Sequence, residues 1–287
     1  MTVKKPDIRH TFTIDWHTRQ WGRGKMAPAP EYVVVHFTGS GKDGGSAIAT
    51  YKDWLTRPKG ERGNSHYIVD ASGIYEGVDP KKYGCLYACA AKEHQASIDA
   101  YVEKYGGRGP LCCDHIKVAG NYNTINIEAC SAKRTPVRHG SDAYMDDDFY
   151  FPNATYRNLV SLVSWLLDEF SIPPANLIMH HQISGKLCPA MWCNSPTALN
   201  GWSAFKNDVL TVMNRPVMAP DLPDPSGEGT AAATSISGEI SVKRGDPIYM
   251  SPGGIEVGFI DSDKSLKYKF IRSGYYYTDE GYVKGGS

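Results

Sequence analysis

The sequence lacks any long apolar run. None of its stretches approaches the roughly 18 consecutive apolar residues that a transmembrane helix needs. The amino-terminal segment contains Lys4 and Lys5, but no apolar stretch of signal-peptide length follows them. We therefore expect a protein that is synthesised in the cytoplasm without a signal peptide and that has no membrane partner.

The sequence also lacks an excess of charge of either sign. Lys and Arg together number 31, and so do Asp and Glu. Nucleic acids and anionic membranes attract proteins that carry clustered positive charge. The composition therefore predicts a protein with no nucleic-acid partner and no preference for an anionic membrane.

A disulfide framework is not expected either. The chain has an odd number of cysteines, namely Cys85, Cys89, Cys112, Cys113, Cys130, Cys188 and Cys193. Thiols stay reduced in a chain that is not exported. The four cysteines in the segment 79–120 have no paired C-x-x-C spacing, so the sequence leaves the role of this segment open.

Strand and helix patterns alternate over the first three quarters of the chain. A run of β-branched residues within 31–39 is typical of a strand that is buried on both faces. Apolar periodicity and turn signals predict further strands within 65–78, at 124–131 and at 176–181, and helices at 46–56, 154–170 and 202–214. Asn153 is expected to cap the helix 154–170. This order predicts an α/β fold with a mixed central sheet flanked by helices.

The composition changes after residue 214. Residues 215–237 are rich in Pro, Gly, Ala, Ser and Thr, so they are expected to form a flexible linker. Residues 238–287 contain short β-type runs separated by Gly, Pro, Asp and Ser, a pattern typical of a small all-β barrel. We predict a large domain over 1–214 and a small one over 238–287.

Residues 179–193, "MHHQISGKLCPAMWC", combine two histidines with a cysteine. A neutral imidazole and a thiolate both bind zinc, at about 2.0 to 2.3 Å. His36 ends the predicted buried strand 31–39 and is a third candidate ligand, or else a core histidine. Three protein ligands with one open position are typical of a catalytic zinc site. From the residues alone, either His180 or His181 pairs with Cys188.

Two charged residues lie near these candidates in the sequence. Glu128 projects from its predicted strand on the side opposite Ile125 and Ile127, where it faces either a cleft or solvent. Lys186 lies two residues before Cys188, where it either stabilises negative charge near a metal or extends into solvent.

Four segments, "VVVHFTGS", "SHYIVDASGIYEGV", "NTINIEACS" and "HHQISGKLCP", occur in this order. Together they resemble the zinc-dependent N-acetylmuramoyl-L-alanine amidases of the phage lysozyme and peptidoglycan-recognition-protein type, over residues 28–214. In that family the last two zinc ligands are a histidine and a cysteine eight residues apart. The resemblance therefore implies that zinc is bound by His36, His180 and Cys188, and it leaves His181 at a variable position.

The resemblance also implies a reaction. Lys186 in "GKLCP" matches the family lysine that lies close to the reacting carbonyl, and Glu128 matches the proton-transfer glutamate of the family's I-G-I-E strand. The implied activity is hydrolysis of the amide between N-acetylmuramic acid and L-alanine in peptidoglycan. Some members place a tyrosine near the metal where this chain has Ser65. Whether Ser65 or His66 takes part in catalysis therefore stays open. The segment 79–120 is longer than its counterpart in the family.

The segment 238–287 weakly resembles the bacterial Src-homology-3-like modules that bind the cell wall, with "GDPIYMSPGG" and "GYVKGG" near its ends. An amidase, a linker and a wall-binding module together resemble a phage endolysin. Such a bacteriolytic, antimicrobial enzyme is expected to be a monomer that accumulates in the host cytoplasm and acts on the cell wall after release. The competing hypothesis is a non-catalytic peptidoglycan-recognition protein, but such proteins often lack the cysteine that Cys188 provides.

Overall fold

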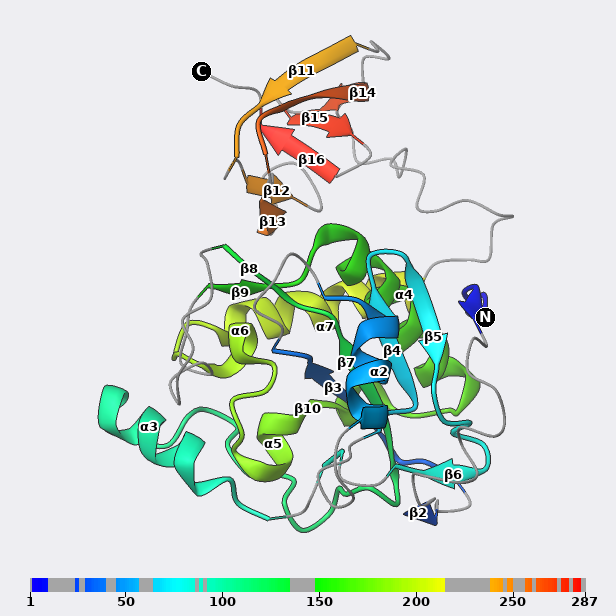
Figure 1. The fold of residues 1–287 in the computed structure, drawn as a ribbon, viewed down its shortest axis with the longest axis vertical. Coiled ribbons are helices and arrows are strands. Elements are labelled where there is room, and N and C mark those ends of the chain that lie inside the picture. Colours follow the sequence, from blue (N-terminus) through cyan, green and yellow to red (C-terminus); the bar gives the residue numbers. More distant parts are fainter. Residues whose placement is uncertain are drawn as a thin grey trace. The chain divides into compact units, whose positions relative to one another are not determined.

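Six strands form the central sheet of the computed structural model, in the order β1-β5-β4-β7-β3-β10 (Figure 1). These strands are β1 (Ile8–Arg9), β3 (Tyr32–Phe37), β4 (Tyr67–Asp70), β5 (Gly73–Glu76), β7 (Thr124–Ala129) and β10 (Leu177–Met179). β4 and β5 form an antiparallel hairpin, whereas the other neighbouring pairs run parallel. The sheet is therefore mixed, which confirms the predicted α/β class.

The structure describes most of the chain, with gaps. The described residues are 2–9, 24–25, 29–39, 45–56, 64–85, 88–89, 92–134, 148–214, 238–244, 247–249, 256–259, 262–272, 275–278 and 281–284. The chain divides into two units, one of Met1–Phe151 with Thr155–Arg215 and one of Pro152–Ala154 with Pro216–Ser287. The predicted linker 215–237 lies outside the described residues.

The first unit is built around β3, which lies between β7 and β10. Its residues Val33, Val34 and Val35 have no exposed surface. Neighbouring side chains on a strand point to opposite faces of the sheet, so β3 is buried on both faces, as its β-branched run predicts. Each fully buried aliphatic side chain of this kind stabilises the fold by about 1.5 to 3 kcal/mol.

Helices cover both faces of this sheet. Figure 1 shows α2 (Ala47–Thr56) in front of the strands, with α4 (Asn153–Glu169) and α7 (Leu199–Met213) behind them. α2 packs Tyr51 and Trp54 with Ile68 of β4 and Tyr75 of β5. The shorter elements of the unit are α3 (Gln95–Tyr105), α5 (His180–Ser184), α6 (Ala190–Cys193), η2 (Pro174–Asn176) and the paired short strands β2 (Gly24–Lys25) with β6 (Tyr83–Gly84) and β8 (Ala132–Lys133) with β9 (Phe149–Tyr150).

Several predicted boundaries are wrong. The strand expected at 176–181 ends at Met179, and His180 begins helix α5. Asn153 is the first residue of α4 instead of its cap. α7 begins three residues earlier than expected, at Leu199. Helix α3, within the segment 79–120, is absent from the sequence-based prediction.

The first described residues belong to the same unit. β1 extends the sheet by pairing with β5, and the backbone N–H of Val3 donates to Asp168 Oδ2 at 2.7 Å. The guanidinium of Arg9 donates to the hydroxyl of Tyr75 at 2.9 Å. Residues 2–9 are therefore anchored to the edge of the sheet and to α4.

The second unit contains a six-stranded sheet in the order β11-β14-β15-β16-β12-β13. Its strands are β11 (Gly238–Val242), β12 (Pro247–Tyr249), β13 (Glu256–Phe259), β14 (Lys264–Arg272), β15 (Tyr275–Thr278) and β16 (Gly281–Lys284). All its strand pairs are antiparallel. Closure of this sheet into a barrel stays a prediction. Over the described part of the chain, no helix has the length and apolar character needed to cross a membrane.

Candidate metal centre

The carboxyl end of β3 carries the first candidate ligand. β3 and β7 run parallel, and His36 is aligned with Glu128. Aligned residues of neighbouring strands project to the same face. Ile125 and Ile127 project to the other face, where both are fully buried. His36 and Glu128 therefore lie side by side at the same end of the sheet.

The other two candidates come from the segment that follows β10. Because β10 pairs in parallel with β3, the start of α5 lies beside the end of β3. α5 ends at Gly185, which has a left-handed φ of 73° and donates its N–H to the carbonyl of His181 at 2.8 Å. The chain then folds back, and the N–H of His181 donates to the carbonyl of Cys188 at 3.0 Å. This turn returns Cys188 to the start of the helix.

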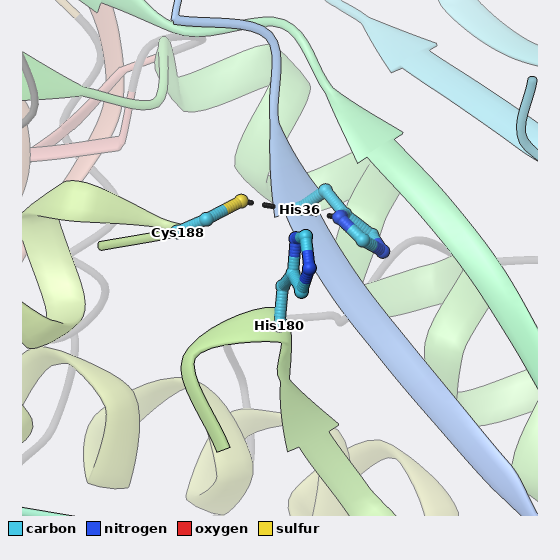
Figure 2. A group of neighbouring side chains, drawn as sticks. All are labelled: His36, His180 and Cys188. Carbon is cyan, nitrogen blue, oxygen red and sulfur yellow. Dashed lines mark hydrogen bonds between the residues drawn. The ribbon is translucent and has the colours of Figure 1, made fainter. Parts of the chain in front are cut away.

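His36, His180 and Cys188 form one buried group. One potential ligand atom from each residue lies within 4.8 Å of the others. The sulfur of Cys188 is 3.9 Å from Nδ1 of His36, and the two imidazole rings are 4.6 Å apart between their centroids. Figure 2 shows the sulfur and the two rings converging on one space from the two strand ends and the turn.

The geometry of this group fits a zinc ion. Zinc binds sulfur at about 2.3 Å and imidazole nitrogen at about 2.0 to 2.1 Å, so tetrahedral ligands of these types lie about 3.6 Å apart. The distance from Cys188 Sγ to His36 Nδ1, 3.9 Å, is close to that value. Nδ1 of His180 is buried without a hydrogen-bond partner among the described residues, a costly state for a polar atom. A metal bond would satisfy it.

The protonation states of the two imidazoles also fit a metal. Burial lowers the pKa of His36 to about 4 and lowers the pKa of His180 well below its usual value, so both imidazoles are neutral at pH 7. Burial raises the pKa of the Cys188 thiol to about 12. A buried thiolate needs a nearby cation, and a zinc ion supplies one.

Lys186 and Glu128 both act electrostatically on this group. The positive charge of Lys186 opposes protonation of His36 and His180 and lowers the pKa of Cys188. The negative charge of Glu128 raises the pKa of Cys188. Both side chains are partly exposed. The structure thus brings all five predicted site residues together, with a cation and a carboxylate beside the ligand set.

Comparison with known families places the chain in one of them. Residues 26–191 match the family Amidase_2, N-acetylmuramoyl-L-alanine amidase, over more than half of the 287 residues. The chain belongs to this amidase family. A search of curated proteins gave no significant match.

Solved structures similar to the amidase chain include the catalytic domain of XlyA, at 22% identity and a TM-score of 0.45, covering 71% of this chain and 99% of that one. A mutant endolysin from Bacillus subtilis gives the same identity, TM-score and coverage. The hydrolase AmiA of Staphylococcus aureus, in complex with its ligand, is 14% identical with a TM-score of 0.40 and covers 74% of this chain and 85% of that one.

His181 of the amidase is buried but is not part of the ligand group. Its Nδ1 lies 3.2 Å from the carbonyl oxygen of Lys186, and its carbonyl accepts a hydrogen bond from the N–H of Cys113. The ring lies against Gly109, where an added Cβ would be 3.2 Å from its Nε2. His181 therefore joins α5 to the segment 109–113.

His66 and Ser65 make contacts within the fold. Nδ1 of His66 accepts a hydrogen bond from the N–H of Asn126 at 2.9 Å, and its Nε2 lies 2.9 Å from the carbonyl oxygen of Tyr83. Burial lowers the pKa of His66 to about 4. The hydroxyl of Ser65 donates to the carbonyl of Tyr67 at 2.8 Å. Both side chains hold backbone segments in place.

All seven cysteines of the amidase chain are free thiols. Cys85 Sγ lies 3.2 Å from Nδ1 of His66, Cys89 Sγ lies 3.4 Å from the hydroxyl of Thr124, and the sulfurs of Cys112 and Cys113 are 3.6 Å apart. Within the part of the chain that the structure describes, they form no second group of three or more potential metal ligands.

Two further residues lie near the metal centre, and sequence reasoning assigned neither of them a role there. His94 precedes α3, where its Nδ1 accepts from the N–H of Ser97 at 3.3 Å and its own N–H donates to the carbonyl of Ser184 at 2.7 Å. Asn126 lies on β7, and its Oδ1 is 3.0 Å from Nε2 of His36.

Proposed function

We propose that this amidase is a zinc enzyme that hydrolyses the amide between the lactyl group of N-acetylmuramic acid and L-alanine in bacterial peptidoglycan. The observation that carries the proposal is the buried group of His36, His180 and Cys188, whose ligand atoms lie within 4.8 Å of one another. Two neutral imidazoles and one cysteine favour zinc over magnesium or calcium. Three protein ligands would leave one position of a bound zinc ion open for water, as in catalytic zinc sites.

His36, His180 and Cys188 would hold the ion. When bound, zinc lowers the pKa of water from 15.7 towards about 7 and polarises a carbonyl as a Lewis acid. Glu128 takes the proton of the attacking water and delivers it to the leaving amine of L-alanine, as a general base and then a general acid. Such proton transfer contributes about 10²- to 10⁴-fold to the rate.

Lys186 has a separate role in the proposed reaction. Its ammonium group stabilises the negative charge that develops on the carbonyl oxygen as water adds. Its electrostatic influence on all three ligand side chains supports this placement. A preorganised charge in a partly buried site is worth far more than the same charge in water.

The biological setting is also part of the proposal. We infer a phage endolysin, a monomer made in the host cytoplasm that reaches the wall after release. The second unit is proposed as a wall-binding barrel that tethers the amidase unit to its polymer and so raises the local substrate concentration. Its support is the weak resemblance of 238–287 to wall-binding modules, together with its antiparallel sheet.

The experiment compares wild type, Cys188→Ser and Glu128→Ala on purified peptidoglycan. Newly exposed L-alanine amino termini and the zinc content of each protein are measured on the same samples. We expect one zinc and cleavage for wild type, loss of both for Cys188→Ser, and zinc without cleavage for Glu128→Ala.

Cys193→Ser is the matched control, since Cys193 is equally buried but donates to the carbonyl of Pro189 and lies outside the ligand group. This variant should keep both zinc and activity. Zinc-loaded wild type that binds peptidoglycan without releasing L-alanine termini would refute the hydrolase and favour a recognition protein.

A further inference from the structure

A buried hydrogen bond links the ligand His36 to Asn126. The distance between His36 Nε2 and Asn126 Oδ1 is 3.0 Å, and neither residue is accessible to solvent beyond 2%. In the parallel pairing of β3 and β7, Asn126 is aligned with Val34, two residues before His36. Val34 and His36 share a face of the sheet, so the Asn126 side chain lies beneath the imidazole on the same face.

The neighbours of Asn126 determine which way its amide points. Its Nδ2 donates to the hydroxyl of Thr124 at 2.9 Å and lies 3.4 Å from the carbonyl of the same residue. The Thr124 hydroxyl gives its own proton to the carbonyl of Gly120, at 2.8 Å, so it accepts from the amide. An amide nitrogen only donates, whereas an amide oxygen only accepts. The oxygen of Asn126 therefore faces His36.

This orientation fixes the tautomer of His36. An oxygen acceptor at Nε2 requires that Nε2 carries the proton. A histidine that binds a metal does so as the neutral imidazole, so Nδ1 is then the nitrogen with a free lone pair. Nδ1 is the atom that faces the sulfur of Cys188 at 3.9 Å. The hydrogen bond to Asn126 thus leaves the lone pair of Nδ1 free on the side of the ring that faces Cys188.

The backbone of Asn126 is held as well. Its N–H donates to Nδ1 of His66 at 2.9 Å, and its carbonyl accepts from the N–H of His66 at 3.0 Å. Asn126 is therefore fixed through its side chain by Thr124 and through its backbone by His66. A buried acceptor with so little freedom controls both the tautomer and the ring orientation of its partner.

We propose that Asn126 is a positioning residue that holds His36 in the Nε2–H tautomer, with Nδ1 presented for zinc. The inference deepens the proposed function and rests on it for the identity of the metal. Outer partners of metal-binding histidines typically change metal affinity by about 10- to 100-fold when removed.

The test uses the full-length protein in two measurements. Nitrogen-15 NMR of the metal-free protein reports which imidazole nitrogen of His36 carries the proton, and chelator competition gives the zinc dissociation constant. Wild type should show the Nε2–H form. Asn126→Ala should show a mixture of tautomers and bind zinc about 10- to 100-fold more weakly, whereas Asn126→Asp, which keeps an acceptor oxygen at Nε2, should retain the Nε2–H tautomer.

Ile125→Val is the control, because Ile125 is fully buried on the opposite face of the same strand. It should lower stability without changing zinc affinity. An Nδ1–H tautomer in wild type, or a folded Asn126→Ala protein with wild-type zinc affinity, would overturn the inference. The wild-type tautomer is measured without any substitution, so a variant that fails to fold does not remove the test. A wild type that binds no zinc refutes the proposed function instead, and its tautomer still tests the role of Asn126.

Discussion

Replacing Gly185 by alanine should destabilise the amidase unit through two separate effects. Gly185 has a φ of 73°, and an added Cβ would lie 2.8 Å from Cδ1 and Cγ1 of Ile98 and 2.9 Å from the sulfur of Cys112. The left-handed conformation costs an L-residue about 1 to 2 kcal/mol. Overpacking against the buried Ile98 adds about 1 to 3 kcal/mol. The expected loss in the free energy of unfolding is therefore about 2 to 5 kcal/mol.

Gly106 provides a matched control. It ends α3 with a similar φ of 79°, but an added Cβ there meets nothing within 4 Å. Gly106→Ala should therefore show only the conformational cost, about 1 to 2 kcal/mol. The difference between the two variants isolates the packing contribution at Gly185.

Denaturant unfolding followed by tryptophan fluorescence measures both variants. All six tryptophans precede residue 203, so the signal reports on the first unit alone. Gly185→Ala should also weaken zinc binding, since Cys188 follows the distorted turn. A Gly185→Ala protein that is no less stable than Gly106→Ala would refute the packing argument.

Three further predictions concern charge, pH and the second unit. Lys186→Ala should keep its zinc and lose about 10²- to 10³-fold in kcat, as measured by release of L-alanine termini; wild-type kcat would contradict the proposed role. The metal-free protein should lose stability as the pH falls from about 6.5 towards 4, because burial lowers the pKa values of His36 and His66 to about 4 and the unfolded chain then binds more protons. Thermal unfolding across this range would show a constant Tm if the reasoning were wrong. A chain truncated to 1–214 should keep hydrolysing soluble muropeptides but sediment less with intact walls, and undiminished sedimentation would exclude tethering by the second unit.

The sequence predicted the elements whose residue pattern by itself indicates the burial that the fold gives them. β3 lies within the predicted strand 31–39, because an uninterrupted β-branched run suits only a strand covered on both faces. The hairpin of β4 and β5 follows from short apolar runs around Ser72-Gly73. In each case the local pattern and the tertiary environment favour the same structure.

The errors occur in elements that are too short or too exposed to show a clear residue pattern. His180 and His181 directly follow the apolar run of β10, yet they begin a helix of five residues, too short to show a periodic pattern. Gln182 stabilises that start, because its side-chain oxygen accepts from the N–H of Met179 at 3.0 Å. α3 was missed because few of its residues are buried, namely Ser97, Ile98 and Tyr101.

The sequence predicted which residues belong to the candidate site, but not the distances and hydrogen bonds between them. The order of His36, Glu128, Lys186 and Cys188 along the chain is readable from the sequence. The bond between His36 and Asn126 joins residues 90 positions apart, and no local pattern encodes such a pairing.

The ligand group of His36, His180 and Cys188 also joins two distant parts of the chain. His36 and Cys188 are separated by 152 positions, so an ion held by both closes a loop that contains most of the first unit. A cross-link across a long loop restricts the unfolded chain and so favours the folded one, and metal binding adds to folding free energy directly. Zinc supply should therefore govern the lifetime of the protein as well as its chemistry. In a zinc-poor medium the protein is expected to open more often and to be degraded sooner by proteases.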